Sequence, residues 1–577
     1  MKQFLAICTG VLILSCSSKN PVSTSMVEMR DGVRLSTLFL FPGEEQEKYP
    51  VVLIRTPYKK ERRIEKYRYI LDHGYVLVIQ DVRGRFESEG KFQPYINEAK
   101  DGYDAVEWIA KQTWCDGNIG MIGASYNGSV QYCAAAEQPP HLKTIIPSIG
   151  SADLFYDGQY FNGVFRPGRL MWCAIIEAIA PDEEIVSKNW KQLLNHSPVS
   201  DLDSIVIGKK LDYYQEWIVH DVKDEYWKQS IHREQLKDIK IPVFTQTGWF
   251  DTHLSSSTLV YEELTKAGNQ NVKMIIGPWG HTDQESKFYN DEFMGEAADD
   301  INLQDQYIRW LNYWLKGEHN GIMDEPLVQL YAINANKWYH SNTYPFPFTT
   351  GTKFYLSSTG TPDLQTNHGK LITEPDLVIE RVDSFTYNPS KVPVYSIEML
   401  ERGRYDDTRK MLEGRKDYLF FKTGTLDDET TIIGPITARM YASTSTPDTD
   451  WFLILVALDE EDRFIDLISI GILRAKFRSS LSKPELVNSE VTHYDFEMKP
   501  YGVKLSRGHK LGLIVTSSFG YPFLTKNLNT GKNNQTETSY LIAQQKIYHS
   551  KEYKSFISIP LLNNDLEAQT ATNNDNE

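Results

Sequence analysis

The stretch "GMIGASYNGS", Gly120 to Ser129, places Ser125 between glycines directly after a short apolar run. It nearly matches G-x-S-x-G, the strand-to-helix turn that presents a nucleophilic serine. The second glycine is displaced, because Asn127 occupies its position and Gly128 follows one residue later. We expect Asn127 to be accommodated because asparagine tolerates crowded or left-handed backbone better than most residues. By itself the motif indicates either a nucleophile elbow or an ordinary turn whose serine caps a helix.

Strands and helices alternate along the chain around this stretch. The runs "YPVVLIRTPY" (49–58) and "YVLVIQDVRG" (75–84) are largely apolar, which is typical of strands buried on both faces of a parallel sheet. Apolar residues recur at helical spacing in "NEAKDGYDAVEWIAKQ" (97–112), and "LKTIIPSIG" (142–150) is a further buried strand. Alternation over 25–41, with "RDG" at the turn, predicts a hairpin. This order predicts a doubly wound α/β domain.

The α/β pattern is interrupted once and then ends. Residues 151–237 are predicted to be helices rich in aromatic and charged side chains, inserted as a cap over the edge of the sheet. Strands and helices return afterwards, so residues 25–150 and 238–320 are expected to form one α/β domain. Short apolar or alternating runs over 321–565 predict an all-β sandwich or jelly roll. The polar residues 566–577 are expected to be a disordered tail.

Size and charge narrow the class of protein. A chain of 577 residues is long enough for two or three domains, and 41% apolar and 24% charged residues are ordinary for a globular protein. The net charge of −16 argues against a nucleic-acid partner, because phosphate binding needs clustered Lys and Arg.

The first residues have the pattern of an export signal. Lys2 precedes "FLAICTGVLIL", an apolar stretch too short to span a bilayer, and "ILSC" ends it at Cys16. This ending resembles a bacterial lipobox, in which Cys16 becomes the lipidated first residue. Leu14 is bulkier than usual in that motif, so a plain signal peptide is the alternative. We expect a signal peptide over 1–16, a tether over 17–24, and an exported lipoprotein, periplasmic or on the cell surface, that touches the membrane only through this anchor.

The remaining cysteines indicate little chemistry. Of five in the chain, Cys8 lies in the predicted signal and Cys16 would carry the lipid. Cys115, Cys133 and Cys173 can form at most one disulfide. Their spacing does not suit a metal site.

Three polar residues each follow a predicted strand, in the order Ser, Asp, His that serine hydrolases built on an α/β sheet use. Ser125 follows "IGMIGA", Asp251 follows "IPVFTQTGWF" and His281 follows "VKMIIGPWG". In such a triad the histidine takes the serine proton and returns it to the leaving group, while the aspartate holds the imidazole in one tautomer. Each residue alone is more often a cap, a turn or a surface side chain. Their order and context together predict a catalytic triad.

Two other histidines are weaker candidates for the base. His253 lies two residues from Asp251 and is better placed to line a pocket, and His141 lies at the wrong end of its strand. The oxyanion hole needs donors aimed at the developing charge. We expect the backbone N–H of Tyr126 and the phenol of Tyr58, in "RTPYKK", to supply them.

Several motifs in register closely resemble the cocaine-esterase and X-Pro dipeptidyl-peptidase-like serine hydrolases. They are "RTPYKK", "DVRGRFESEG", "GMIGASYNG", "GWFD" and "GPWGH", and the similarity continues in order to about residue 560. The resemblance implies an α/β-hydrolase domain, a helical cap and a C-terminal jelly roll. It also implies Ser125, Asp251 and His281 as the triad, Tyr58 and Tyr126 as oxyanion donors, and no metal or cofactor.

The sequence departs from one branch of this family. The α-amino-acid ester hydrolases carry acidic residues shortly after the catalytic aspartate, whereas Thr252, His253 and Leu254 stand here. Asp157 could supply one carboxylate to hold a substrate ammonium, but we do not expect an enzyme that is specific for α-amino-acid esters. Candidate aromatic residues for the acyl pocket, for which core packing is the alternative, are Trp172, Trp249, Phe250 and Trp279.

The predicted function is an exported serine hydrolase that cleaves an ester or amide acyl bond of a small molecule or short peptide. The triad and oxyanion hole serve both bonds, so the chemistry alone does not separate an acyl esterase from a dipeptidyl-peptidase-like enzyme. The alternative is a catalytically inactive glycan- or peptide-binding lipoprotein that uses its jelly roll. An intact triad distinguishes the two, because a binding protein need not keep one.

Overall fold

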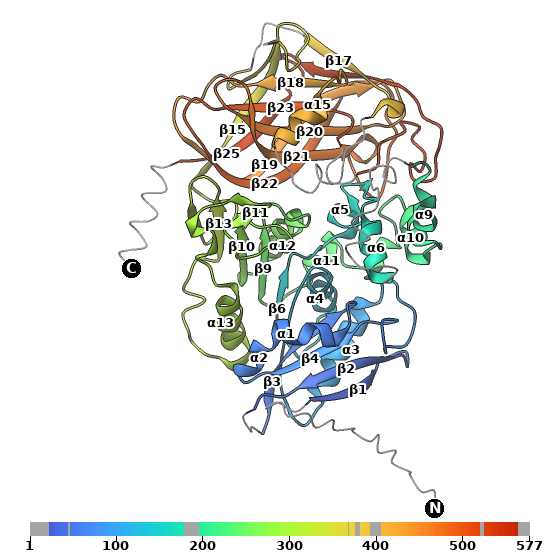
Figure 1. The fold of residues 1–577 in the computed structure, drawn as a ribbon, viewed down its shortest axis with the longest axis vertical. Helices are drawn as coiled ribbons and strands as arrows, with labels where there is room; N and C mark the ends of the chain where they lie inside the picture. Colours follow the sequence, from blue (N-terminus) through green and yellow to red (C-terminus); the bar gives the residue numbers. More distant parts are fainter. Residues whose placement is uncertain are drawn as a thin grey trace, which may run out of the picture.

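The computed structural model describes residues 22–43, 47–177, 196–366, 368–375, 381–392, 405–519 and 524–563. It contains an α/β domain, a group of short helices and a C-terminal all-β domain, which confirms the predicted fold class (Figure 1). The predicted signal peptide with Cys16, most of the predicted tether and the predicted tail lie outside the described residues. Within those ranges, no helix combines the length and apolar character needed to cross a membrane.

A ten-stranded sheet forms the centre of the α/β domain, in the order β1-β2-β4-β3-β5-β6-β9-β10-β13-β14. Pairs from β4 through β13 are parallel, and the strands at both edges pair antiparallel. The predicted hairpin is confirmed as β1 with β2. The strands are β1 Val22–Glu28, β2 Arg34–Leu40, β3 Tyr49–Thr56, β4 Val76–Asp81, β5 Cys115–Ala124, β6 Leu142–Ser148, β9 Val243–Gly248, β10 Val272–Gly277, β13 Val328–Ala332 and β14 Lys337–Ser341.

Helices connect these strands and cover the sheet. β3 and β4 are buried along their whole length, as their apolar runs predict, because helices pack on both sides of a parallel sheet. Leu311 and Leu315 of α13 approach so closely that a Cβ at Gly120 of β5 would come within 3.1 Å of each. The helices of this domain are η1 Lys60–Arg63, α1 Ile64–Tyr67, α2 Tyr69–Asp72, α3 Glu98–Ala110, α4 Tyr126–Ala136, α12 Leu254–Lys266, η4 Glu296–Asp299 and α13 Leu303–Lys316, and a small hairpin joins β11 Phe288–Tyr289 to β12 Glu292–Phe293.

The described part of the predicted cap is mainly helical. Its buried side chains, such as Tyr160, Tyr214 and Trp217, form an aromatic cluster that continues into Tyr126 of the α/β domain and Phe477 of the all-β domain. Its elements are α5 Leu154–Asp157, β7 Tyr160–Phe161, β8 Val164–Phe165, α6 Arg169–Glu177, η2 Val199–Asp201, α9 Leu202–Ile207, α10 Asp212–Val219, η3 Trp227–Gln229 and α11 Arg233–Leu236.

Two predicted boundaries differ from the structure. β13 and β14, which were expected to open the all-β domain at residue 321, extend the first sheet instead. β13 pairs with β10 in register Met274↔Val328 and so covers an edge that would otherwise be unpaired. A strand pattern identifies a strand but not the sheet that it joins. Similarly, β1 begins at Val22, within the predicted tether 17–24.

The all-β domain contains an eleven-stranded sheet that folds over an apolar core, part of which is continuous with the core of the α/β domain. Most of its strands pair antiparallel, as in a jelly roll. Its elements are β15 Thr349–Ser358, β16 Gly369–Ile372, β17 Arg381–Tyr387, η5 Pro389–Lys391, α15 Tyr405–Leu412, β18 Tyr418–Lys422, β19 Thr430–Thr444, β20 Asp450–Leu458, β21 Phe464–Arg474, η6 Ala475–Phe477, β22 Thr492–Leu505, β23 Lys510–Thr516, β24 Ala543–His549 and β25 Phe556–Leu562.

The all-β domain lies against both other parts of the chain (Figure 1). Ile333, just after β13, forms a bridge with Val503 of β22. The Tyr156 hydroxyl of the cap donates to Glu497 at 3.0 Å, and the Thr525 amide donates to a carbonyl of the cap. These contacts hold the cap between the sheet and the all-β domain.

Candidate active site

Ser125 lies on the sharp turn between β5 and α4. Its backbone has φ 62° and ψ −123°, a strained conformation for a residue with a side chain, and its N–H donates to Ser148 O at 3.0 Å. The left-handed alternative for Asn127 was wrong, because Asn127 lies in α4 and the positive φ belongs to Ser125 itself. The backbone beside Asn127 is crowded, since a Cβ at Gly123 would come 2.6 Å from the Cβ of Asn127. The glycine at position 123 leaves the room that Asn127 needs.

The displaced glycine has a packing role. A Cβ at Gly128 would lie 2.6 Å from Ser148 O at the end of β6. The first turn of α4 therefore rests directly on the neighbouring strand, and only a glycine permits that approach. The turn keeps the geometry of an elbow although its second glycine comes one position late.

The loops that carry Asp251 and His281 pack against each other through Trp279. Backbone N–H groups of Trp249 and Phe250 donate to the "GPWGH" loop. A Cβ at Gly248 would lie 2.0 Å from Trp279 O, so the glycine of "GWFD" is required by this close approach. The contact fixes the spacing between the carboxylate and the imidazole.

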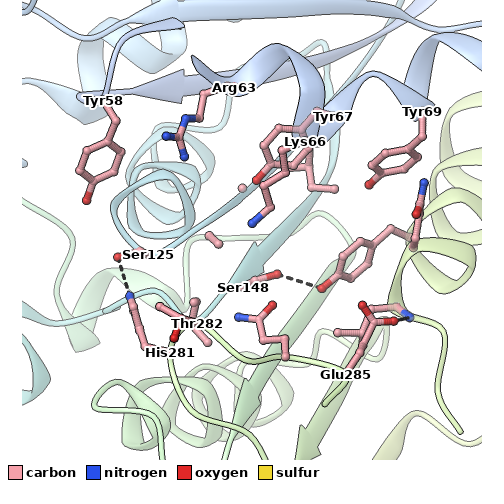
Figure 2. A pocket seen from close by; sticks show the side chains of 18 residues that line it. Tyr58, Arg63, Lys66, Tyr67, Tyr69, Ser125, Ser148, His281, Thr282 and Glu285 are labelled. Atoms are coloured by element: carbon pink, nitrogen blue, oxygen red, sulfur yellow. Dashed lines mark hydrogen bonds between the residues drawn. The ribbon is translucent and has the colours of Figure 1, made fainter. Parts of the chain in front are cut away.

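The three residues predicted as a triad form one hydrogen-bonded chain. His281 Nδ1 lies 2.7 Å from Asp251 Oδ2, and His281 Nε2 lies 3.0 Å from Ser125 Oγ (Figure 2). Asp251 is fully buried, and its second oxygen accepts the His253 N–H at 2.6 Å. The imidazole side chain is 38% exposed, so it faces an open cavity on one side and a buried carboxylate on the other.

The other candidate histidines do not reach Ser125. The His253 ring contacts Asp157 O and Arg169 Nη2 at 2.8 and 3.0 Å. Burial, and then the neighbouring Arg169 cation, keep its pKa well below the usual range. His141 contacts Glu107 at the opposite end of β6.

The Tyr58 hydroxyl faces Ser125 and is oriented by the cap. Trp172 Nε1 of α6 donates to Tyr58 Oη at 2.9 Å. Because indole is a donor only, the phenol accepts this bond and keeps its own proton for another acceptor. Desolvation raises the pKa of Tyr58, against hydrogen bonds to Trp172 and Ser125 that lower it. The phenol therefore stays protonated at neutral pH.

Tyr126 is the first residue of α4, so its N–H has no acceptor within the helix. Its side chain is held by a buried network in which the hydroxyl donates to Glu98 at 2.7 Å and Glu98 pairs with Arg55. Its ring also stacks on Trp172, with centroids 6.0 Å apart. The backbone beside Ser125 is thereby fixed by groups from three segments.

Sequence reasoning assigned several aromatic residues to the acyl pocket, and the structure separates them. Trp172 lies at Tyr58 and Tyr126, where it contacts both predicted oxyanion donors, a role that the sequence did not indicate. Trp249 and Trp279 are buried in the core, and Phe250 stacks on Tyr289. Asp157, the candidate carboxylate, is fully buried and accepts the Ser256 N–H.

A cavity of about 700 Å³ opens beside Ser125 and His281 (Figure 2). Its walls come from the segment after β3, the end of β5, the end of β6 and the loop after β10. A volume of this size suits a small molecule or a short peptide. Its other polar side chains include Tyr67, Tyr69, Ser148, Thr282, Gln284 and Tyr307.

Comparisons with known proteins identify the family of the chain. The family model of the X-Pro dipeptidyl-peptidase (S15 family) matches residues 31–283, and that of the X-Pro dipeptidyl-peptidase C-terminal non-catalytic domain matches residues 320–558. The chain is 29% identical to the cocaine esterase of Rhodococcus sp. (strain MB1 Bresler), over 94% of this chain and 98% of that protein.

Solved structures share the fold across the whole chain. An aminopeptidase from a marine sediment Thaumarchaeota archaeon superposes with a TM-score of 0.79 at 22% identity, covering 94% of this chain and 97% of that one. An α-amino-acid ester hydrolase superposes with a TM-score of 0.78 at 22% identity, covering 97% and 100%. The fold and the site define a hydrolase with an α/β catalytic domain. The chain belongs to the cocaine-esterase and X-Pro dipeptidyl-peptidase-like serine hydrolases.

Proposed function

We propose that the protein cleaves an ester or amide acyl bond through an acyl-enzyme intermediate on Ser125. The observation that carries the proposal is the position of His281, which bridges the Ser125 hydroxyl and the buried Asp251 carboxylate at 3.0 and 2.7 Å. A serine hydroxyl is a weak nucleophile until a neighbouring base accepts its proton. The arrangement supplies that base in the required tautomer.

In the first half of the reaction Ser125 Oγ attacks the substrate carbonyl carbon while His281 Nε2 accepts its proton. The tetrahedral intermediate collapses when the imidazolium gives that proton to the leaving alcohol or amine. In the second half a water molecule attacks the acyl-enzyme, His281 accepts the water proton, and Ser125 recovers its proton as the acid product leaves. Asp251 stabilises the imidazolium in both halves without being protonated.

The oxyanion formed in each half needs donors on the side of Ser125 away from His281. We assign this role to the Tyr58 hydroxyl and the Tyr126 N–H. Two observations support the assignment: the Tyr58 phenol accepts from Trp172 and so keeps its own proton to donate, and the Tyr126 N–H has no acceptor within α4. The N-terminal end of α4 also carries a partial positive charge that favours an anion.

The substrate class follows from the cavity and the relatives together. A volume of about 700 Å³ admits a small ester or amide or a short peptide. A relative is a cocaine esterase, and the matching family model is that of an X-Pro dipeptidyl-peptidase. Both esters and peptide amides therefore belong in the assay.

A fluorophosphonate probe tests the nucleophile. The wild-type protein should be labelled, and Ser125→Ala should not be labelled and should lose roughly four to six orders of magnitude in rate. Ser129→Ala, four residues further along α4, is the matched control and should be labelled like the wild type. Labelling that persists in Ser125→Ala would refute the assignment.

We also propose that the protein is exported and anchored by a lipid on Cys16. The proposal rests on Lys2, the short apolar stretch after it and the "ILSC" ending. Growth with a labelled fatty acid should label the wild type in a bacterial host and leave Cys16→Ser unlabelled. If the wild type takes up no labelled fatty acid and is released into the soluble fraction, the result would indicate a plain signal peptide instead.

A further inference from the structure

Two cationic side chains reach into the cavity beside Ser125. Arg63 ends η1 and Lys66 lies in α1, on the segment that follows Tyr58. Figure 2 shows both side chains extending from this segment into the space in front of Ser125 and Ser148. They are the cations among the residues that line the cavity.

Neither cation is neutralised by a carboxylate in the described part of the chain. By contrast, two other cations of the same segment are paired: Lys60 with Asp81 at 3.2 Å and Arg68 with Glu65 at 3.1 Å. Arg63 Nε is buried and has no acceptor among the described residues. The guanidinium lies instead over the Tyr58 ring, 5.6 Å from its centroid. A buried guanidinium N–H without an acceptor is unfavourable unless a ligand supplies one.

Glu285 is the carboxylate that lines the same cavity, and it is engaged elsewhere. One of its oxygens accepts the Leu303 N–H at the start of α13, at 2.6 Å. Desolvation in the cleft, and then repulsion from Arg63, lower the pKa of Lys66. An anion bound between Arg63 and Lys66 would offset the repulsion between the two cations and would stabilise the charged form of Lys66.

The cavity is open to a leaving group, because both Ser125 and His281 line it. Its wall opposite Arg63 and Lys66 is the loop that begins at His281 and continues through Thr282 to Glu285 (Figure 2). His281 must give its proton to the departing oxygen or nitrogen. That atom therefore departs into the cavity that His281 shares with Arg63 and Lys66.

We propose that Arg63 and Lys66 bind a carboxylate on the leaving group, so that the protein prefers esters or amides of hydroxy acids or amino acids with a free carboxylate. A guanidinium and an ammonium together suit a carboxylate. The guanidinium of Arg63 gives directed hydrogen bonds, and the ammonium of Lys66 gives a compact charge. The carboxylate can be part of the leaving alcohol of an ester, or it can be the C-terminus of a short peptide. Both leaving groups present the same anionic group to Arg63 and Lys66. This inference rests on the proposed function of Ser125 and His281.

A matched pair of esters tests it. 3-Acetoxybenzoate and 3-acetoxybenzamide have the same acyl group and leaving groups of the same shape, one anionic and one neutral. The wild type should favour the anion in kcat/KM by roughly ten- to a hundredfold, the range expected for hydrogen bonds to a charged group. Arg63→Gln and Lys66→Gln should each lower this ratio about fivefold or more, mainly by changing the rate for the anion. Arg62→Gln, an exposed arginine outside the cavity, removes the same charge and should keep the ratio.

A binding measurement separates this inference from the proposed catalysis. Ser125→Ala protein should bind 3-hydroxybenzoate more tightly than 3-hydroxybenzamide in calorimetry, and Lys66→Gln in the same background should abolish the difference. Equal affinities for the two ligands, or an equal ratio in Lys66→Gln and Arg62→Gln, would overturn the anion site. If the wild type hydrolyses neither ester, the proposed function fails on these substrates, and the calorimetric comparison alone decides the inference.

Discussion

The indole N–H of Trp172 donates a 2.9 Å hydrogen bond to the hydroxyl of Tyr58. Trp172 belongs to α6 of the cap, and Tyr58 follows β3 of the sheet, so the bond connects the inserted helices to the catalytic domain. The same indole stacks on the Tyr126 ring with an interplanar angle of 10°. The cap therefore contacts the side chains of both residues that we assign to the oxyanion hole.

Replacing Trp172 with Phe should weaken catalysis without removing it. The aromatic ring and its stacking on Tyr126 remain, while the hydrogen bond that orients the Tyr58 phenol is lost. We expect kcat/KM for a neutral ester to fall about tenfold, the value of one ordinary hydrogen bond. In a Tyr58→Phe background the same change should have little further effect, because the bond no longer exists. Additive losses would show that Trp172 acts independently of Tyr58.

Removing the Tyr58 hydroxyl should have a larger effect. Tyr58→Phe should reduce kcat by about two to three orders of magnitude and leave KM nearly unchanged, because an oxyanion donor acts in the transition state. Tyr213→Phe, which removes a cap hydroxyl bonded to Glu177, is the control and should retain activity. An unchanged kcat in Tyr58→Phe would exclude the phenol from the oxyanion hole.

Asp251→Asn tests the tautomer of His281. The amide keeps the volume of the carboxylate and can still accept the His253 N–H, but it no longer favours the proton on His281 Nδ1. We expect a loss of about four orders of magnitude in kcat at pH 7. The melting temperature should change little by comparison. An activity within tenfold of the wild type would mean that another group orients the imidazole.

Asp157 gives a pH dependence of stability. Burial raises its pKa from 3.8 to about 6, against the nearby charges of Lys499 and Arg166. Because the folded-state pKa lies above the unfolded one, its contribution to stability is complete below pH 3.8 and is lost as the pH rises through about 6. The loss is on the order of 3 kcal/mol by pH 7.

Asp157→Asn should remove this dependence. Asp157 Oδ2 accepts the Ser256 N–H, which the amide oxygen can also accept, and no hydrogen bond to Oδ1 is present among the described residues. The variant should therefore gain melting temperature relative to the wild type between pH 4 and pH 7. Parallel melting curves across that range would contradict the raised pKa.

Much of the architecture could be predicted from local patterns. Apolar runs such as those of β3 and β4 identify strands buried on both faces, and helical spacing over residues 97–112 identifies α3. The sheet to which a strand belongs is a long-range property. β13 and β14 have the same pattern as strands of the all-β domain, yet they complete the first sheet by pairing with β10.

For the site, the sequence by itself determined which residues could do the chemistry. Chain order, with each residue just after a predicted strand, predicted Ser125, Asp251 and His281, because parallel strands bring their carboxyl ends to one edge of the sheet. Tertiary structure alone decided that Trp172 contacts Tyr58, that His253 contacts Arg169 instead of Ser125, and that Arg63 and Lys66 line the cavity. These contacts join segments far apart in the chain, and side chains meet across such distances only after the sheet, the cap and their loops have packed.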